Sequence, residues 1–468
     1  MSGEPVNVAP APLAGDGARA ELATLVRLAL PIALAQAGLM ALTLVDVAIV
    51  GRVSVNELAA CAMGRTIVHT CNALGVGVAA ALDPLASQAI GAGRPAEAWA
   101  ALRSTVIAGL LISLVALVVA LAATAALEPM GVDAALVPGV RRYILGHVLW
   151  VFLYPVFLAG KSFLQARGVT RPALIAVVAA NAVNLVACSL LVRGDDALLW
   201  AGLPPLGLPQ LGALGAGLAA SLSGVVLSSI VLWSARRAAP PAAAAPPAVP
   251  VPLATVYRLG LPVGFQLLAE TSVFGLTALL AGRLGAPVVS AHQVAIGLAA
   301  FTFMGALGVG SATAVRVGHA VGAGRPPLRA GLLGILLGAA FMCVSAALYA
   351  AYPRALLGVF TQDAEVLAIG VPLLRIAALF QLFDGVQAVA AGALRGAGDV
   401  KFPFWVNLGA HWALGVPLSM GLAFWLDLGV RGLWLGLTAG LVAVAAVLAA
   451  RFVRVARAPI ARALSRGG

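Results

Sequence analysis

Long, uninterrupted apolar stretches dominate this chain of 468 residues and exclude most folds. Hydrophobic residues make up 62% of the chain and charged residues only 10%, whereas soluble globular proteins are about half apolar and about a quarter charged. So few charges cannot cover a surface that faces water. The stretches are rich in Ala and Leu and long enough to cross a bilayer as helices, and they lack the alternation of a membrane β-barrel. We therefore expect an all-α integral membrane protein.

Twelve stretches are long enough to cross the membrane, and we expect twelve transmembrane helices. The first one is a retained span, because no signal-peptide pattern precedes it. The expected spans lie near residues 25–50, 59–90, 98–124, 140–164, 172–192, 211–234, 255–281, 289–320, 328–352, 366–394, 402–426 and 431–452.

The two halves of the chain repeat each other. The segment LALPIALAQ (28–36) parallels LGLPVGFQ (259–266), and QAIGAGRP (88–95) parallels HAVGAGRP (319–326), without a gap between the two matches. Each half contains six spans, so both halves enter the membrane in the same direction. This predicts two pseudo-symmetric six-helix bundles with a cavity between them, an arrangement typical of secondary transporters.

A segment rich in Pro and Ala separates the halves and suits a semi-rigid linker. The predicted division of the chain is an N-terminal tail 1–24, an N-terminal lobe 25–235, a linker 236–254, a C-terminal lobe 255–452 and a basic tail 453–468.

The distribution of basic residues predicts the orientation in the membrane. With the N-terminus inside the cell, most of the 29 Lys and Arg residues fall on the cytoplasmic side, as the positive-inside rule requires. Both termini and the linker are then cytoplasmic, and the net charge of +12 reflects topology rather than nucleic-acid binding. Basic residues near the ends of spans are counted with the side that they face, and the remaining two, Arg65 and Arg375, are placed within spans. The arginines on the outer side are Arg52, Arg141, Arg142, Arg193, Arg283, Arg354 and Arg431.

Four acidic residues lie inside the expected spans: Asp46, Asp83, Glu270 and Asp384. An ionised group at the bilayer centre costs roughly 2.5–3.5 kcal/mol on insertion scales, so such groups normally face a cavity or a partner. Burial favours the protonated carboxyl, and a nearby cation favours the ionised one. A cavity carboxylate therefore exchanges a proton, a sodium ion or a cationic substrate, which is the chemistry of an antiporter.

Amide side chains accompany the acids at helical spacing. Their oxygens suit a hard cation such as Na⁺, but amides also join membrane helices, at about 0.6 kcal/mol each. The sequence leaves open whether the amides bind a cation or join helices. It also leaves open whether Asp83 belongs to a gate or makes a salt bridge at a helix end. The amides expected around the acids are Gln36, Gln266, Gln381, Gln387, Asn181 and Asn184.

The sequence contains no nucleotide-binding, metal-binding or catalytic motif. The four cysteines lie within apolar stretches without metal-ligand spacing, and neither GxxxxGK[ST] nor HExxH occurs. We expect no enzymatic activity, no cofactor and no resident metal other than a coupling ion.

Five segments resemble the multidrug and toxic compound extrusion (MATE) family, in its NorM-type branch. In chain order they are LPIALAQ…LVDVAIVGR, DPLASQAIGAGR, ETSVFGLTALLAGRLG…VSAHQVA, RVGHAVGAGR and FQLFDGVQAVAAGALRGAGD, and the resemblance covers about 25–452. It implies a bacterial inner-membrane transporter, acting as a monomer, that exports organic cations and amphipathic drugs against Na⁺ or H⁺.

The resemblance also assigns residues. Glu270 matches the acid of the family's cation site, and Asp384 matches its partner, so that Na⁺ is expected between them if sodium is the coupling ion. Asp46 matches a first-span aspartate implicated in proton coupling. The fifth-span polar position falls on Asn184, with Asn181 as its neighbour.

Two other functions are weighed against transport of drugs. A flippase for lipid-linked oligosaccharides, from the same superfamily, would need a cationic cavity for pyrophosphate, but the spans hold four acids and two arginines. A channel or receptor without coupled transport does not explain the paired acids or the duplicated halves. The sequence favours the antiporter.

Overall fold

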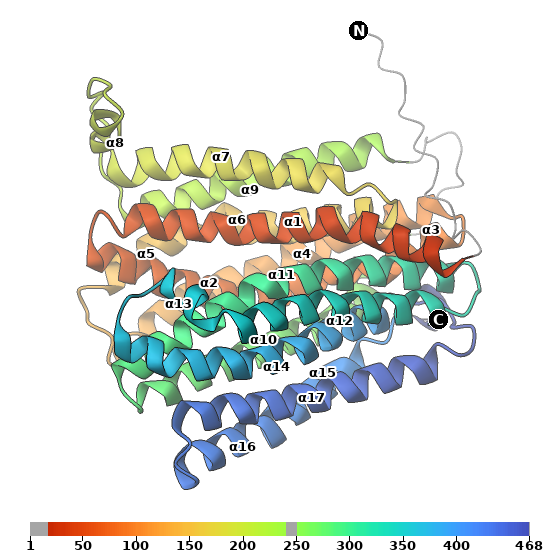
Figure 1. Cartoon of the computed structure of the whole chain (residues 1–468). Helices are drawn as coiled ribbons and strands as arrows, with labels where there is room; N and C mark the ends of the chain where they lie inside the picture. The colour runs from red at the N-terminus through yellow and green to blue at the C-terminus, as the bar shows by residue number, and fades with distance from the viewer. Residues whose placement is uncertain (1–16, 240–249, 468) are drawn as a thin grey trace. The chain divides into compact units, whose positions relative to one another are not determined.

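The computed structural model describes residues 17–239 and 250–467, which are helical with no β-strand (Figure 1). Parts of the predicted N-terminal tail and linker, residues 1–16 and 240–249, and the final residue 468 lie outside the described residues. The helices of the first half are α1 (Ala18–Val50), α2 (Val55–Ala80), α3 (Leu82–Gly91), α4 (Pro95–Ala123), η1 (Thr124–Ala126), α5 (Val137–Gly146), α6 (Val148–Ala166), α7 (Arg171–Arg193), α8 (Asp195–Trp200) and α9 (Ala213–Arg237).

The second half repeats the pattern of long helices joined by short turns. Its helices are α10 (Leu253–Gly282), α11 (Ala286–Gly322), α12 (Leu328–Ala351), α13 (Pro353–Gly358), α14 (Ala364–Gly396), α15 (Lys401–Leu408), η3 (Gly409–Gly415), α16 (Val416–Met420), η4 (Gly421–Trp425), α17 (Gly429–Val455) and η5 (Leu464–Gly467).

Eleven helices in the described ranges are long and apolar enough to cross a membrane. The remaining predicted span, 402–426, is also helical, but two π-helical segments, η3 and η4, divide it into short pieces. The predicted all-α membrane fold is confirmed, and each of the twelve expected spans is helical.

The described chain forms two compact units. The first contains Ala37–Leu82 and Pro95–Gly264, and the second contains Asp83–Arg94, Phe265–Gly468 and the described part of Ala9–Gln36. The units therefore differ from the two predicted lobes, because the start of α1 and most of α3 belong to the unit made mainly of C-terminal helices. The lobes follow the sequence repeat, whereas the units follow packing.

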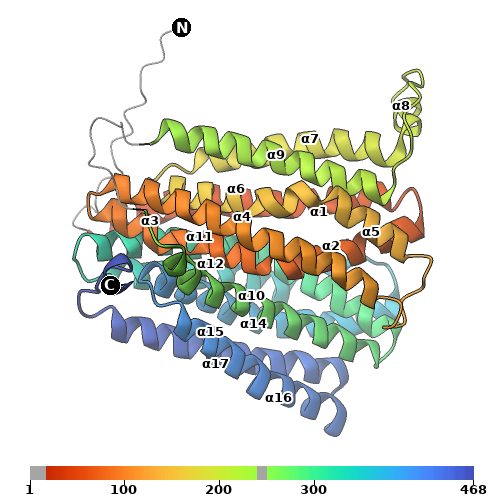
Figure 2. The ribbon, with the colours of Figure 1, turned by 180° about the vertical axis from the view of Figure 1, so that it is seen from behind.

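In the first unit, α9 packs against α5, α6 and α7, and α2 packs against α4, α5 and α6. Figures 1 and 2 show α7 and α9 side by side along their length. The break between α5 and α6 falls at His147, and Ser221 of α9 restores hydrogen bonds there. Its hydroxyl donates to the carbonyl oxygen of Gly146 (2.6 Å) and accepts from the backbone N–H of Trp150 (3.3 Å).

In the second unit, α14 packs against α11, α12 and α17. Glycines spaced by four residues on α17, including Gly432 and Gly436, let the interrupted α15–η4 helix approach closely. A Cβ atom at Gly436 would lie 2.2 Å from the backbone nitrogen of Ser419. Small residues at this spacing are typical of tightly packed membrane helices.

A buried ion pair explains why the start of α1 belongs to the second unit. The guanidinium of Arg316, on α11, donates from Nε to Glu21 Oε1 (2.8 Å) and from Nη2 to Glu21 Oε2 (2.7 Å). Both side chains are 5% exposed. This two-point contact fixes the first turn of α1 against α11.

Candidate functional site

The two acids of the second unit lie close together, on different helices. Glu270 is on α10 and Asp384 is on α14, both half-buried. The two carboxylates are near enough to interact electrostatically. The structure thus brings together the pair that the sequence singled out, although 114 residues separate them in the chain.

One amide side chain donates a hydrogen bond to this acid pair. Gln387, on α14 and almost fully buried, donates from Nε2 to Glu270 Oε1 (3.0 Å). Asp384 receives no hydrogen bond from any residue in 17–239 or 250–467, and Gln266 makes none either, although it lies one turn from Glu270 on α10. The acid pair therefore has one neutral donor and no cationic partner among the described residues.

Gln381 lies on the same helix as Asp384 but has a different neighbourhood. Its Nε2 donates to Thr302 Oγ1 of α11 (2.5 Å), and Thr302 lies 3.2 Å from the hydroxyl oxygen of Tyr349 on α12. These contacts join three helices. For Gln381 the structure favours the helix-joining interpretation over a place beside the acids.

The third acid, Asp46, lies in the first unit. Asp46 Oδ1 on α1 accepts a hydrogen bond from Asn184 Nδ2 on α7 (2.7 Å), and Asn184 Oδ1 accepts one from the hydroxyl of Ser223 on α9 (3.1 Å). This chain of contacts joins three helices and fixes the orientation of the amide. Of the two expected asparagines, Asn184 is the one that contacts the acid.

Asn181 is one turn away from Asn184, and its side chain faces backbone atoms instead. Its Nδ2 lies 2.9 Å from the carbonyl oxygen of Gly38 and 2.8 Å from that of Val177. Asn181 therefore holds α1 against α7. Gln36 lies half-buried near the middle of α1.

Asp46 lines a cavity of about 70 Å³ within the first unit. This volume has room for a few water molecules but not for a drug. Two basic side chains of α2, Arg65 and His69, line it as well, together with Asn184 and Ser223. The lining thus includes an acid, a guanidinium and two imidazoles, those of His69 and His147.

A row of rings on α5 and α6 forms another wall of this cavity. Ring centroids are 4.9 Å apart for Tyr143 and His147, 5.7 Å for His147 and Trp150, and 5.0 Å for Trp150 and Tyr154. His147 is 4% exposed, and neither of its ring nitrogens has a hydrogen-bond partner in the described chain. The sequence signal for this row of rings is its spacing of three and four residues, which marks one helix face.

Asp83 makes a salt bridge at a helix end. Its Oδ2 lies 2.9 Å from Nε of Arg395 near the end of α14, and both side chains belong to the second unit. Nearby, Gln88 of α3 donates to the carbonyl oxygen of Gly396 (2.9 Å) and accepts from the backbone N–H of Ala463 (2.7 Å). Of the two open interpretations of Asp83, the structure favours the salt bridge.

The described ranges contain no group of three or more His, Cys, Asp or Glu side chains placed to hold a metal ion. Any cation held at Glu270 and Asp384 would therefore depend on the two carboxylates and the amide of Gln387.

Comparison with known families decides where this fold belongs. The MatE family model matches residues 31–190 and 262–420, once in each half of the chain. The chain belongs to the MatE family. Both matches begin at the paired prolines of the repeat, Pro31 and Pro262. The internal duplication is therefore a duplication of one MatE unit.

Relatives match the chain over nearly its full length. It is 37% identical over 449 residues to a probable multidrug resistance protein NorM of Deinococcus radiodurans, covering 94% of this chain and 96% of that one. It is 30% identical to the multidrug resistance protein NorM of Vibrio cholerae, covering 92% and 95%. The solved structure of the eukaryotic MATE transporter AtDTX14 has the same fold, with a TM-score of 0.81, 22% identity and coverage of 96% and 100%.

Proposed function

We propose that this MatE protein is a multidrug efflux transporter of the bacterial inner membrane that exchanges organic cations and amphipathic drugs for H⁺ or Na⁺. The multidrug resistance proteins among its relatives support the substrate class. The observation that carries the exchange mechanism is the acid pair Glu270–Asp384, which has one amide donor and no cationic partner in the described chain.

Two carboxylates cannot both stay ionised at this position without compensation. Each charge in a span is costly, and the neighbouring like charge adds repulsion. A bound proton, sodium ion or cationic drug removes this cost, and the three compete for the same site. Binding of the coupling ion therefore weakens drug binding, and loss of the ion restores it.

The electrochemical gradient of the coupling ion supplies the driving force, because a monovalent drug cation that leaves against one ion that enters moves no net charge. Each positive charge that moves inward gains about 2.3 kcal/mol per 100 mV. In the proposed cycle the coupling ion binds from the outside, releases the drug there, and dissociates to the cytoplasm. The proposed orientation, with both termini cytoplasmic, rests on the distribution of Lys and Arg.

Asp46 is proposed as a second proton-binding group. Its carboxylate accepts a hydrogen bond from Asn184, and the cavity beside it has room for water that can deliver a proton. The position of Asn184, held in turn by Ser223, supports this assignment.

The test measures efflux of a fluorescent organic cation from proteoliposomes. A sodium gradient and a pH gradient are imposed separately on the wild type, Glu270→Gln and Asp384→Asn. Matched controls are Glu365→Gln and Asp427→Asn, which change the same residue types at exposed positions. We expect one gradient to drive efflux in the wild type and in both controls, and efflux to fall to background in the two site variants.

Three results would count against the proposal. Unchanged efflux in both site variants would make the acid pair structural. Efflux that neither gradient accelerates would exclude exchange coupled to Na⁺ or H⁺. Transport of lipid-linked oligosaccharide without transport of any organic cation would replace the antiporter with a flippase.

A further inference from the structure

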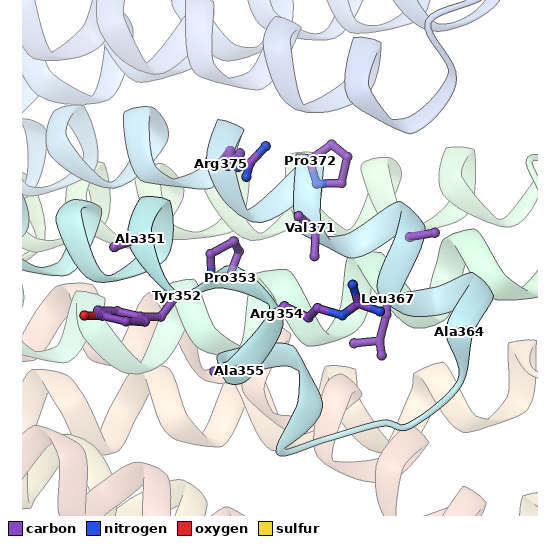
Figure 3. Close-up of a pocket in the computed structure, with 11 residues that line it drawn as sticks. Ala351, Tyr352, Pro353, Arg354, Ala355, Ala364, Leu367, Val371, Pro372 and Arg375 are labelled. Carbon is purple, nitrogen blue, oxygen red and sulfur yellow. The ribbon is translucent and has the colours of Figure 1, made fainter.

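A groove in the second unit is lined by two arginines. It encloses about 640 Å³ between the end of α12, the short helix α13 and the first turns of α14 (Figure 3). Arg354 of α13 and Arg375 of α14 line it. Figure 3 shows the side chain of Arg354 running from α13 towards Leu367 of α14. Both arginines are exposed, and neither makes a hydrogen bond or ion pair within the described ranges.

The groove lies at one end of a helix that is long enough to cross a membrane. The helix α12 has 24 residues and is therefore about 36 Å long, enough to cross a hydrocarbon core of about 30 Å. The last residue of α12, Ala351, lines the groove together with Tyr352 and Arg375. Arg375 follows the first three turns of a long apolar helix, yet it lines the same groove as the last residue of α12.

The remaining lining is apolar. Leu367, Val371 and Pro372 of α14 and Ala355 of α13 contribute hydrocarbon surface next to the two guanidinium groups. A small soluble anion would leave that surface facing water. A phospholipid satisfies both parts, because its phosphate accepts hydrogen bonds from arginine and its acyl chains cover the apolar wall.

The first unit has a groove at the corresponding place in its repeat. It encloses about 530 Å³ between η1, the turn that follows η1, and α5, and it too is lined by two exposed arginines, Arg141 and Arg142. Arg142 Nε contacts the carbonyl oxygen of Pro138 (3.4 Å), and Glu128 adds one negative charge to this groove. In both repeats the groove lies between the third and fourth spans.

These arginines also violate the rule that sets the orientation. Arg141, Arg142 and Arg354 are among the basic residues that the proposed topology places on the outer side, where Lys and Arg are depleted. Two arginines line an apolar groove in each half, and three of the four run against this bias, which indicates a ligand with negative charge and hydrocarbon.

We propose that each groove binds one anionic phospholipid of the adjoining leaflet, with the phosphate between the arginines and the acyl chains along the apolar wall. The groove of the second unit binds more tightly, because Glu128 opposes the anion in the first. The site is separate from the acids Glu270, Asp384 and Asp46, so it does not depend on the identity of the coupling ion or the drug.

Native mass spectrometry of the full-length protein in detergent tests this. Phosphatidylglycerol is the probe, phosphatidylethanolamine is the zwitterionic comparison, and inorganic phosphate is the soluble competitor. The variants are Arg354→Gln/Arg375→Gln and Arg141→Gln/Arg142→Gln. The matched control is Arg52→Gln/Arg283→Gln, which removes two exposed arginines of the same membrane side that line neither groove.

We expect two phosphatidylglycerol molecules to bind to the wild type and to the control. Each arginine near an anionic headgroup changes affinity about fivefold, so each groove double variant should bind its lipid about thirtyfold more weakly. Glu128→Gln should strengthen binding in the first groove about fivefold. A normal size-exclusion profile shows that each variant is folded, as expected for changes at exposed positions.

Several results would overturn the proposal. One is equal phosphatidylglycerol binding in the wild type and in folded groove variants. Another is an equal loss in the control pair, which would reveal general charge attraction. Equal binding of phosphatidylethanolamine would exclude selectivity for an anionic lipid, and displacement of the lipid by inorganic phosphate would make the groove a site for soluble anions.

Discussion

The buried ion pair between Glu21 and Arg316 gives a quantitative test of how the start of α1 is held. Two short hydrogen bonds, of 2.8 and 2.7 Å, join side chains that are each 5% exposed. Removing one partner of a buried pair leaves an uncompensated charge and typically costs about 3–5 kcal/mol. We therefore expect Glu21→Leu and Arg316→Met each to lose about that much stability.

The double variant should behave differently from the sum of the two single variants. Replacing both charges with apolar side chains leaves no charge unpaired, and such replacements are often neutral or stabilising. The loss in Glu21→Leu/Arg316→Met should therefore be smaller than in either single variant, with a coupling of several kcal/mol between the sites.

The assay is the apparent Tm of the purified protein in detergent, read by fluorescence size exclusion after heating. For a unit of this size, about 3–5 kcal/mol corresponds to a drop on the order of 10 °C in the single variants. The control is Arg325→Met, an exposed arginine just beyond α11, which should leave Tm unchanged. Additive losses in the double variant, or single variants that match the control, would refute the argument.

Three further predictions follow from other contacts. Gly436→Ala should lower Tm because its Cβ would lie 2.2 Å from the backbone nitrogen of Ser419. The control Gly409→Ala should not lower Tm, because no atom of a neighbouring element lies within 4 Å of the new Cβ. Equal Tm values in the two variants would show that the helices can separate without cost. Asn184→Leu should abolish gradient-driven efflux while the protein stays folded, because the donor to the first-span carboxylate is lost, and normal efflux would exclude a role for that contact. Backbone N–H groups, that of Leu208 first, hold the pKa of Asp195 below its usual value. Their bonds to the ionised carboxylate therefore stabilise the loop before α9 above about pH 4, and this stabilisation is lost as pH falls through the lowered pKa. Asp195→Asn should speed amide hydrogen exchange in this loop at neutral pH, and unchanged exchange would contradict this.

Much of the candidate site was predictable because membrane burial makes certain residues conspicuous. An acid in an apolar span is costly wherever its helix lies, so Glu270, Asp384 and Asp46 stand out in a single sequence. The pairing of Glu270 with Asp384 also followed, through the family resemblance. The fifth-span position Asn184 was found in the same way, and its contact with Asp46 supports it.

The partners of these acids were harder to predict, because helical spacing reports only neighbours on the same helix. Gln266 shares a face with Glu270, yet the donor to Glu270 is Gln387 of α14. Gln381 shares a face with Asp384, yet it contacts Thr302 of α11. In each case the helix packing decides which amide meets which acid.

The sequence by itself determined that the chain lies in a lipid bilayer, that it is helical and that its two halves repeat each other. Apolar length dictates membrane helices, because every backbone group in a bilayer must be satisfied within its own segment. The matched segments of the two halves determined the repeat, and the family comparison found the same division at residues 31–190 and 262–420.

Only the tertiary structure decided which distant residues meet. The salt bridge between Asp83 and Arg395 joins positions 312 residues apart, and the groove that holds Arg354 beside Arg375 requires α13 to fold back against α14. Such contacts depend on how close packing aligns whole helices, and no local spacing records that alignment.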